Sequence, residues 1–135
     1  LSAIWLPGEV REIRAFAPDE SIVFGYFDSG ESSAKAVQTL IDTHVVYVTL
    51  NACKSSVMAR CSNKLKRAGR KAVATSDKDI ASSTLLLVDL DPKRPSGISA
   101  SKEEMQAAHT LAKKIIAEVG APLIFGMSGN GFHLI

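Results

Sequence analysis

The segment of residues 82–135 constrains the fold of this chain more than any other. It begins with an apolar run, residues 85–88, that leads directly into Asp89-Leu90-Asp91-Pro92. It ends with Asn130-Gly131 between two short apolar runs, and Asn-Gly is the strongest short-range signal for a β-hairpin. A helical pattern lies between these two motifs. The order therefore predicts a β-α-β-β unit with polar side chains at its strand ends.

The helical pattern has clear start and stop signals. Ser101 and Glu104 have the spacing of a capping box, and Gly120 followed by Pro122 ends the pattern. One stripe of the helix is apolar; its members are Met105, Ala108, Ala112, Ile115, Ile116 and Val119. Residues 82–91 are almost continuously apolar, which predicts a central strand covered on both faces.

The N-terminal part of the chain predicts a separate α/β module. Alternating polarity and β-branched residues predict strands over residues 9–17, 21–27 and 44–50. Apolar residues at helical spacing predict a helix over residues 31–41. A second, basic helix is expected over residues 55–68, ended by Gly69. We therefore expect a single mixed α/β (α+β) domain, with one module in residues 1–80 and a second in residues 81–135.

Asp89 and Asp91 form the first candidate site. Side chains alternate along a strand, so these two carboxylates should share a face, with Cα atoms roughly 6.5–7 Å apart. Two like charges this close favour a bound cation, and hard oxygen ligands select Mg²⁺ or Mn²⁺ over zinc. The alternative is that one Asp caps a loop and the other starts a turn. Lys93 and Arg94 follow, where they contact either a triphosphate or solvent.

The hairpin is the second candidate site. A two-residue type I′ turn at Asn130-Gly131 would place Gly129 opposite Phe132 and Ser128 opposite His133 on one polar face. Hydroxyl, imidazole and glycine backbone N–H groups suit a phosphate. The opposite face should belong to the core; it carries Phe125, Met127, Phe132 and Leu134. The alternative is a plain tight hairpin with a surface histidine.

A basic block without acidic residues lies within the first module, between Lys54 and Lys71. Its members are Lys54, Arg60, Lys64, Lys66, Arg67, Arg70 and Lys71. Such a block is either a solvated helix face or a contact to a nucleic-acid backbone. Asp77 and Asp79 form a second D-x-D pair, but in a polar loop, where turn or cap roles fit better.

The composition excludes several classes of protein. A hydrophobic share of 46% with 22% charged residues is typical of a soluble globular protein. No apolar stretch approaches the ~18 residues of a membrane span. Cys53 and Cys61 match no common zinc spacing, which indicates reduced thiols and a cytoplasmic protein. The chain starts without Met and stops just after the second motif, so we expect it to be part of a longer protein.

The ordered pair DLDP and SGNGFH resembles the archaeo-eukaryotic primase superfamily, in particular the primase-polymerase domains of plasmids and phages. The stretches VYVTLN, ending at Asn51, and ATSDKDI, residues 74–80, also resemble this branch. The resemblance implies the primase catalytic fold, with an RRM-like β-α-β-β half, and a DNA primase/polymerase activity that transfers nucleotides to a DNA template and primer.

The resemblance also implies roles for individual residues. Asp89 and Asp91 would bind two divalent ions, Mg²⁺ or Mn²⁺, while Ser128 and His133, with Gly129 and Asn130, would hold the phosphates of a nucleoside triphosphate. The basic block would bind template or primer, and a helicase domain or protein is a further implied partner. The superfamily has a third motif, a carboxylate on a later strand. This chain stops before it, so we expect the fragment to be incomplete as a catalyst.

Two other functions remain open from the residues. A non-catalytic nucleic-acid-binding module would keep the basic block but would not need both motifs. A phosphatase of the haloacid dehalogenase type also ends an apolar strand in D-x-D, but its nucleophile lies near the N-terminus, whereas Asp89 lies late in this chain.

Overall fold

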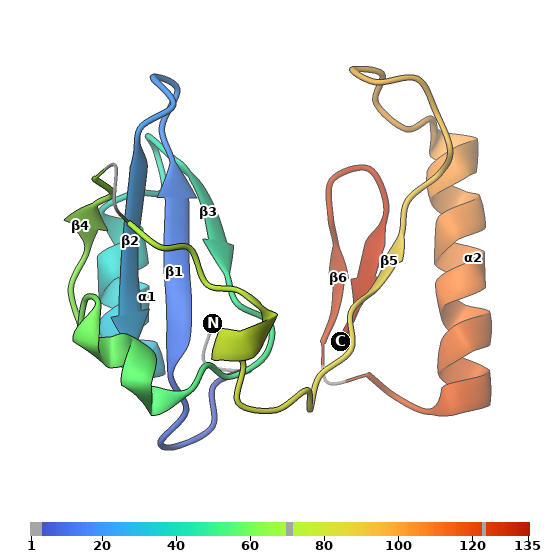
Figure 1. Ribbon diagram of the computed structural model, residues 1–135. Coiled ribbons are helices and arrows are strands. Elements are labelled where there is room, and N and C mark those ends of the chain that lie inside the picture. Colours follow the sequence, from blue (N-terminus) through green and yellow to red (C-terminus); the bar gives the residue numbers. More distant parts are fainter. Residues whose placement is uncertain (1–3, 70–71, 123) are drawn as a thin grey trace. The chain divides into compact units, whose positions relative to one another are not determined.

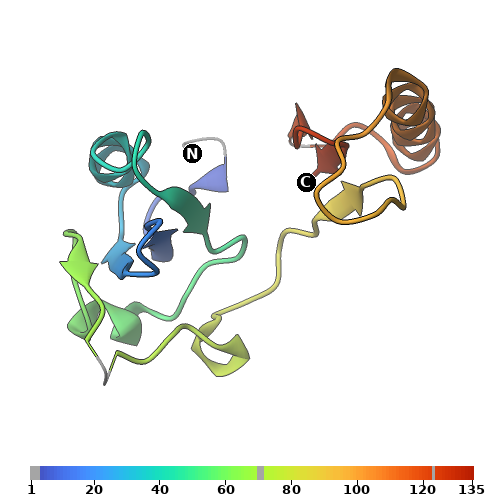
Figure 2. The same cartoon turned by 90° about the horizontal axis from the view of Figure 1, so that it is seen from above.

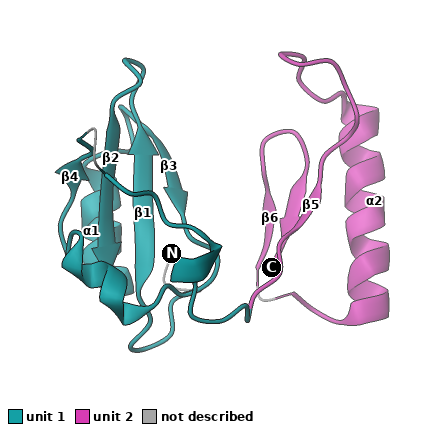
Figure 3. Ribbon diagram, in the orientation of Figure 1, with its two compact units in different colours: residues 1–84 teal, residues 85–135 magenta. Residues whose placement is uncertain are grey.

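The computed structural model describes residues 4–69, 72–122 and 124–135, so Arg70 and Lys71 of the basic block lie outside the described residues. The chain divides into two compact units, residues 1–84 and residues 85–135 (Figure 3). Each unit combines an antiparallel sheet with an α-helix, which makes the protein a mixed α+β fold. Among the described residues, no helix is both long and apolar enough to cross a membrane.

The N-terminal unit is built on a four-stranded antiparallel sheet in the order β3-β1-β2-β4 (Figure 1). The strands are β1 (Arg11–Phe16), β2 (Ile22–Phe27), β3 (Val45–Val48) and β4 (Lys66–Arg67). The first three confirm the strands expected from alternation. β4 was not expected, because only two residues pair with β2 and both are charged.

Helix α1 (Gly30–Gln38) covers one face of this sheet, and Figure 2 shows it on the side opposite the short helix η2 (Ser55–Ala59). The Ser29 side chain caps α1 by accepting a hydrogen bond from the Ser32 backbone N–H. Under the helix lies a buried cluster of Trp5, Ile13 and Phe27. The helix expected in residues 31–41 is therefore confirmed.

The opposite face packs against the chain after β3. Its buried cluster consists of Val10, Phe24, Tyr26, Cys53, Val57 and Cys61. Both cysteines are buried free thiols, and burial raises the pKa of Cys53 above its ordinary value. The region that holds them therefore serves the core of the unit.

The basic helix expected over residues 55–68 is wrong. Only η2 is helical, as a 3-10 helix, and the chain then runs along the edge of β2 until it pairs with that strand as β4. The Tyr26 N–H donates to the Cys61 carbonyl, and the Tyr26 carbonyl accepts from Asn63, whose φ of 48° is left-handed. These sheet-edge bonds and the left-handed residue stop the helix.

The short helix η3 (Asp77–Asp79) confirms the cap role expected for its aspartates. Ser76 is its N-cap, and the Asp79 carboxylate accepts from the Ser76 backbone N–H in a capping box. Arg60 also donates to both Asp79 carboxylate oxygens, at 2.7 and 3.2 Å. The Arg60 guanidinium thus joins η3 to the region of η2.

The C-terminal unit has a three-stranded antiparallel sheet in the order β5-β7-β6, with helix α2 (Lys102–Val119) after β5. The strands are β5 (Val88–Leu90), β6 (Phe125–Met127) and β7 (Phe132–Leu134). Both capping-box bonds between Ser101 and Glu104 are present, and Gly120 is the C-cap with φ of 104°. The capped helix and the two hairpin strands are confirmed.

The prediction of a central strand over residues 82–91 is wrong. β5 has three residues and pairs only with β7, so it lies at an edge of the described sheet, and Leu86 is 76% exposed. Apolar content alone does not make a strand, because the ladder extends only as far as its partner does. The expectation that Met127 belongs to the core is also wrong, since its side chain is largely exposed. Phe125 and Phe132 stack with His109 of α2 instead.

Candidate functional site

Asp89 of β5 and His133 of β7 lie directly opposite each other across the sheet. Asp89 Oδ1 is 3.4 Å from His133 Nε2, and both side chains are partly exposed. On the other side of β7, His133 is paired with Gly126 of β6, where a Cβ would meet open space. A carboxylate and an imidazole therefore share one accessible face of this sheet.

Asp91 lies on the same edge, beside the hairpin turn. A Cβ on Gly131 would overlap the Leu90 carbonyl and come within 3.0 Å of Asp91 Oδ1. Only glycine lets the turn approach the end of β5 this closely. Gly131 thus allows the hairpin to approach Asp91 closely. The sequence pattern did not reveal this approach, because it predicted only a turn at Gly131.

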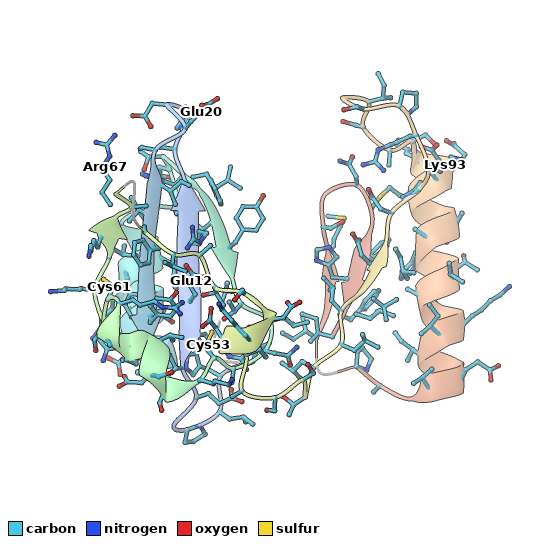
Figure 4. The ribbon with its side chains drawn as sticks, in the orientation of Figure 1. Glu12, Glu20, Cys53, Cys61, Arg67 and Lys93 are labelled. Atoms are coloured by element: carbon cyan, nitrogen blue, oxygen red, sulfur yellow. The ribbon has the colours of Figure 1, made fainter. Side chains whose placement is uncertain are left out.

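The loop between β5 and α2 encloses a cavity of about 500 Å³ beside Asp91. Arg94 fastens this loop: its Nη1 lies 3.1 Å from Asp91 Oδ1, and the guanidinium donates to the Pro92 and Ile98 carbonyls at 2.9 Å each. Lys93 also lines the cavity and is exposed on the loop after β5 (Figure 4). The structure therefore brings Asp91, Lys93 and Arg94 to one cavity.

Asn130 lines the same cavity, and its Oδ1 accepts from the Ala100 backbone N–H at 3.1 Å. The predicted type I′ turn at Asn130-Gly131 is wrong, because the positive φ of this loop is at Gly129, at 101°. The loop runs from Ser128 to Gly131, and the Ser128 N–H donates to the Gly131 carbonyl. The bond to Ala100 holds the Asn130 side chain against the long loop.

The predicted facing pair of Ser128 and His133 is therefore also wrong. The four-residue loop shifts the register by two residues, so His133 faces Gly126, and Met127 in place of Gly129 faces Phe132. Ser128 is exposed at the start of the turn. The histidine remains on the polar face, but its nearest polar partner is Asp89.

Two described members of the basic block, Lys54 and Arg60, have acceptors within the N-terminal unit. Arg60 donates to Asp79 and Tyr26, and Lys54 donates to the Lys78 carbonyl. Exposed residues among the described members of the block are Lys54, Lys64, Lys66 and Arg67. Arg67 is 3.9 Å from Asp19. Hydrogen bonds from Arg60 hold the pKa of Asp79 well below its usual range.

Asp89 and Asp91 are suited to bind a divalent cation, because both side chains are carboxylates and both are accessible to solvent. Asp89 and Asp91 are oxygen ligands on one sheet edge, and Mg²⁺ is commonly bound through one or two carboxylates together with water and substrate phosphates. In the part of the chain that the structure describes, no three His, Cys, Asp or Glu side chains form a set that could hold a metal ion. Asp89 and Asp91 would thus be two ligands of a site completed by other groups.

The N-terminal unit holds a second cavity, of about 560 Å³, that sequence reasoning missed. It is lined by Glu12 and Arg14 of β1, Tyr47 of β3, and loop residues that include Ser76. The available signal was the alternation of β1, which places Glu12, Arg14 and Phe16 on one face of a strand.

Comparison of the chain with protein-family models, with curated proteins and with solved structures found no match in any of the three.

Proposed function

We propose that this chain carries the metal- and nucleotide-binding part of a primase-polymerase, which catalyses template-directed nucleotidyl transfer from nucleoside triphosphates. The observation that carries the proposal is the position of Asp89 opposite His133, with Asp91 on the same edge beside Gly131. Two carboxylates, one in β5 and one just after it, and an imidazole in β7 fit the roles that the primase resemblance implies for them.

The negatively charged residues would bind cations, and His133 and Lys93 would contact the phosphates. Asp89 and Asp91 would hold divalent ions, which when bound activate the attacking 3′-hydroxyl and neutralise the leaving pyrophosphate. His133 would donate a hydrogen bond to the phosphates from beside the carboxylates, and the exposed Lys93 would add positive charge at the cavity. The Arg94 guanidinium, which contacts Asp91 and two carbonyls, would keep the loop and the carboxylate in position.

The superfamily's third carboxylate would complete the metal site. Asp89 and Asp91 supply two ligands, so the chemistry needs a further group from elsewhere in the natural protein or from the nucleotide. Metal and nucleotide binding can therefore be tested apart from extension of a primed template, which needs the complete metal site.

The binding test follows the NMR signals of this chain during titration with Mn²⁺, with and without a nucleoside triphosphate. Paramagnetic broadening should centre on residues 89, 91 and 133, and Asp89→Asn should remove it. The matched control is Asp42→Asn, which changes an exposed carboxylate in the other unit. Broadening that is unchanged in Asp89→Asn and Asp91→Asn contradicts the metal assignment.

The activity test is extension of a primed DNA template by the natural protein in Mg²⁺ or Mn²⁺. Asp89→Asn and Asp91→Asn should each reduce extension to the level without divalent cation, while His133→Ala should mainly raise the KM for the nucleotide. Full extension by both aspartate variants excludes this function and leaves the non-catalytic nucleic-acid-binding module as the alternative.

A further inference from the structure

One face of the N-terminal sheet carries a row of side chains that alternates aromatic and basic residues. The register pairs Tyr47 with Arg14, Arg14 with Phe24, and Phe24 with Lys66, so the row crosses all four strands. Arg14 lies over the Phe24 ring at 5.6 Å. Tyr47 is 59% exposed at one end of the row, and Lys66 is exposed at the other.

The Tyr47 ring is held from one side. Phe16 contacts it edge-on, with ring centroids 5.7 Å apart and an interplanar angle of 86°. An exposed aromatic ring that is already positioned by a neighbour offers a flat face at little cost in conformational entropy. This ring lines the cavity of about 560 Å³ in the same unit.

Glu12 and Arg14 supply hydrogen-bonding groups to that cavity. The Glu12 side chain is only 4% exposed, and both Arg14 bonds go to its Oε1, from Nε at 2.9 Å and Nη2 at 2.6 Å. Glu12 Oε2 and Arg14 Nη1 take no part in these two bonds. Figure 4 shows Glu12 on β1, in the middle of this sheet. The Glu12 carboxylate and the Arg14 guanidinium therefore both lie at the cavity, each with a polar atom outside their ion pair.

We propose that this surface binds a nucleobase of single-stranded nucleic acid. The base would stack on Tyr47 and pair the adjacent donor and acceptor of its edge with Glu12 and Arg14. Unpaired bases are recognised in this way, by stacking on aromatic side chains and hydrogen bonding along their edges. The proposal goes beyond nucleotidyl transfer, because it requires neither metal nor catalysis.

The length of the row favours a strand over a free nucleotide. Three steps between neighbouring strands, at ~4.8 Å each, separate Tyr47 from Lys66 by roughly 14 Å. That distance exceeds one nucleotide. Because Phe24 is buried and Arg14 lies over its ring, a backbone that continues from the stacked base toward Lys66 would pass over Arg14. Lys66 would contact a phosphate in a way that does not depend on the base.

The experiment measures binding of a fluorescently labelled single-stranded oligonucleotide by anisotropy, in EDTA. A matched abasic oligonucleotide of the same length retains the phosphates but has no bases. The chain should bind the base-containing strand more tightly, and Tyr47→Ala should reduce that affinity about 5- to 100-fold, as the loss of one base–aromatic stack implies. Tyr47→Phe should retain it.

Val45→Ala is the matched control, because Val45 lies on the same face of the same strand and is 60% exposed. It should leave the affinity unchanged. Lys66→Gln should weaken both oligonucleotides equally. Circular dichroism checks that Tyr47→Ala is folded.

Equal affinity for the two oligonucleotides, or equal effects of Tyr47→Ala and Val45→Ala, overturns the base site. Complete displacement of the strand by a micromolar mononucleoside overturns the strand as its occupant. Because EDTA is present, these outcomes are independent of whether Asp89 and Asp91 support catalysis.

Discussion

The Arg60–Asp79 ion pair gives two charged residues a structural role within the N-terminal unit. Arg60 Nη2 lies 2.7 Å from Asp79 Oδ1, and the Ser76 backbone N–H donates to Asp79 Oδ2 at 3.0 Å. These hydrogen bonds favour the ionised carboxylate and hold the pKa of Asp79 well below its usual range. The pair therefore makes the N-terminal unit sensitive to acid.

We predict that Asp79→Asn removes stability at neutral pH, and removes a smaller but still measurable amount at pH 3. A carboxylate whose pKa is depressed by folding stabilises the fold above its unfolded pKa of about 3.9, and this contribution is lost as the pH falls toward the folded pKa. Urea unfolding at pH 7, 5 and 3 measures the difference between variant and wild type. Asp77→Asn, an exposed change in the same turn, is the control, and an Asp79→Asn effect that is constant with pH contradicts the assignment.

The sequence could predict the cap residues but not the partner of Arg60. Asp79 lies in a local pattern with Ser76, and local patterns carry their own signal. Arg60 was grouped with other basic residues by charge, yet its acceptors are Asp79 and Tyr26, 19 and 34 residues away. A charge pattern does not show which cations have internal acceptors.

At the scale of elements, the hairpin shows what a turn motif can and cannot specify. Asn-Gly correctly indicated two antiparallel strands, and the alternation correctly placed His133 on the polar face. The register differed, because the loop has four residues, Ser128 to Gly131, with its positive φ at Gly129. Its Asn130 side chain also accepts from the Ala100 N–H, 30 residues away. The expected Ser128–His133 pair depended on that register, whereas the Asp89–His133 pair depends on β5, whose position beside β7 no local motif specifies.

We predict that Gly131→Ala separates β5 from the hairpin. The added methyl group would overlap the Leu90 carbonyl, and overpacking of this kind costs about 1–3 kcal/mol. Amide hydrogen exchange in β5 and β7 should accelerate accordingly. Gly126→Ala is the control, because a Cβ there meets open space. Equal exchange rates in the two variants would mean that Gly131 does not set the approach of β5.

The segment of residues 55–68 was mispredicted as a helix for a related reason. Its composition allows a helix, but the free edge of β2 offers backbone hydrogen bonds to the Cys61 and Asn63 region and to β4. Tertiary pairing overrides a weak local preference. Consequently Lys66 lies at the end of a cross-strand row rather than on a helix face.

At the scale of the whole molecule, the two proposed activities belong to different units. Asp89, Asp91 and His133 lie in residues 85–135, and Tyr47 with its row lies in residues 1–84. The sequence order of the motifs could indicate two halves, since each half has its own alternation and helix. It could not indicate the proposed base site, because Tyr47 and Arg14 come together only once β3 is paired with β1.

The division into units predicts where the native chain is cleaved first. Residues 81–84 are exposed, Leu86 and Leu87 are exposed as well, and residues 81–87 form neither helix nor strand. Proteases cut such segments before packed elements, because the chain must fit into the protease in an extended form. Thermolysin, which cuts before large apolar residues, should therefore act first at residues 85–87 and release two fragments that mass spectrometry identifies. Replacing Leu86 and Leu87 with Ser should slow this cleavage, whereas a first cut within α2 or between β1 and β2 contradicts the two-unit description.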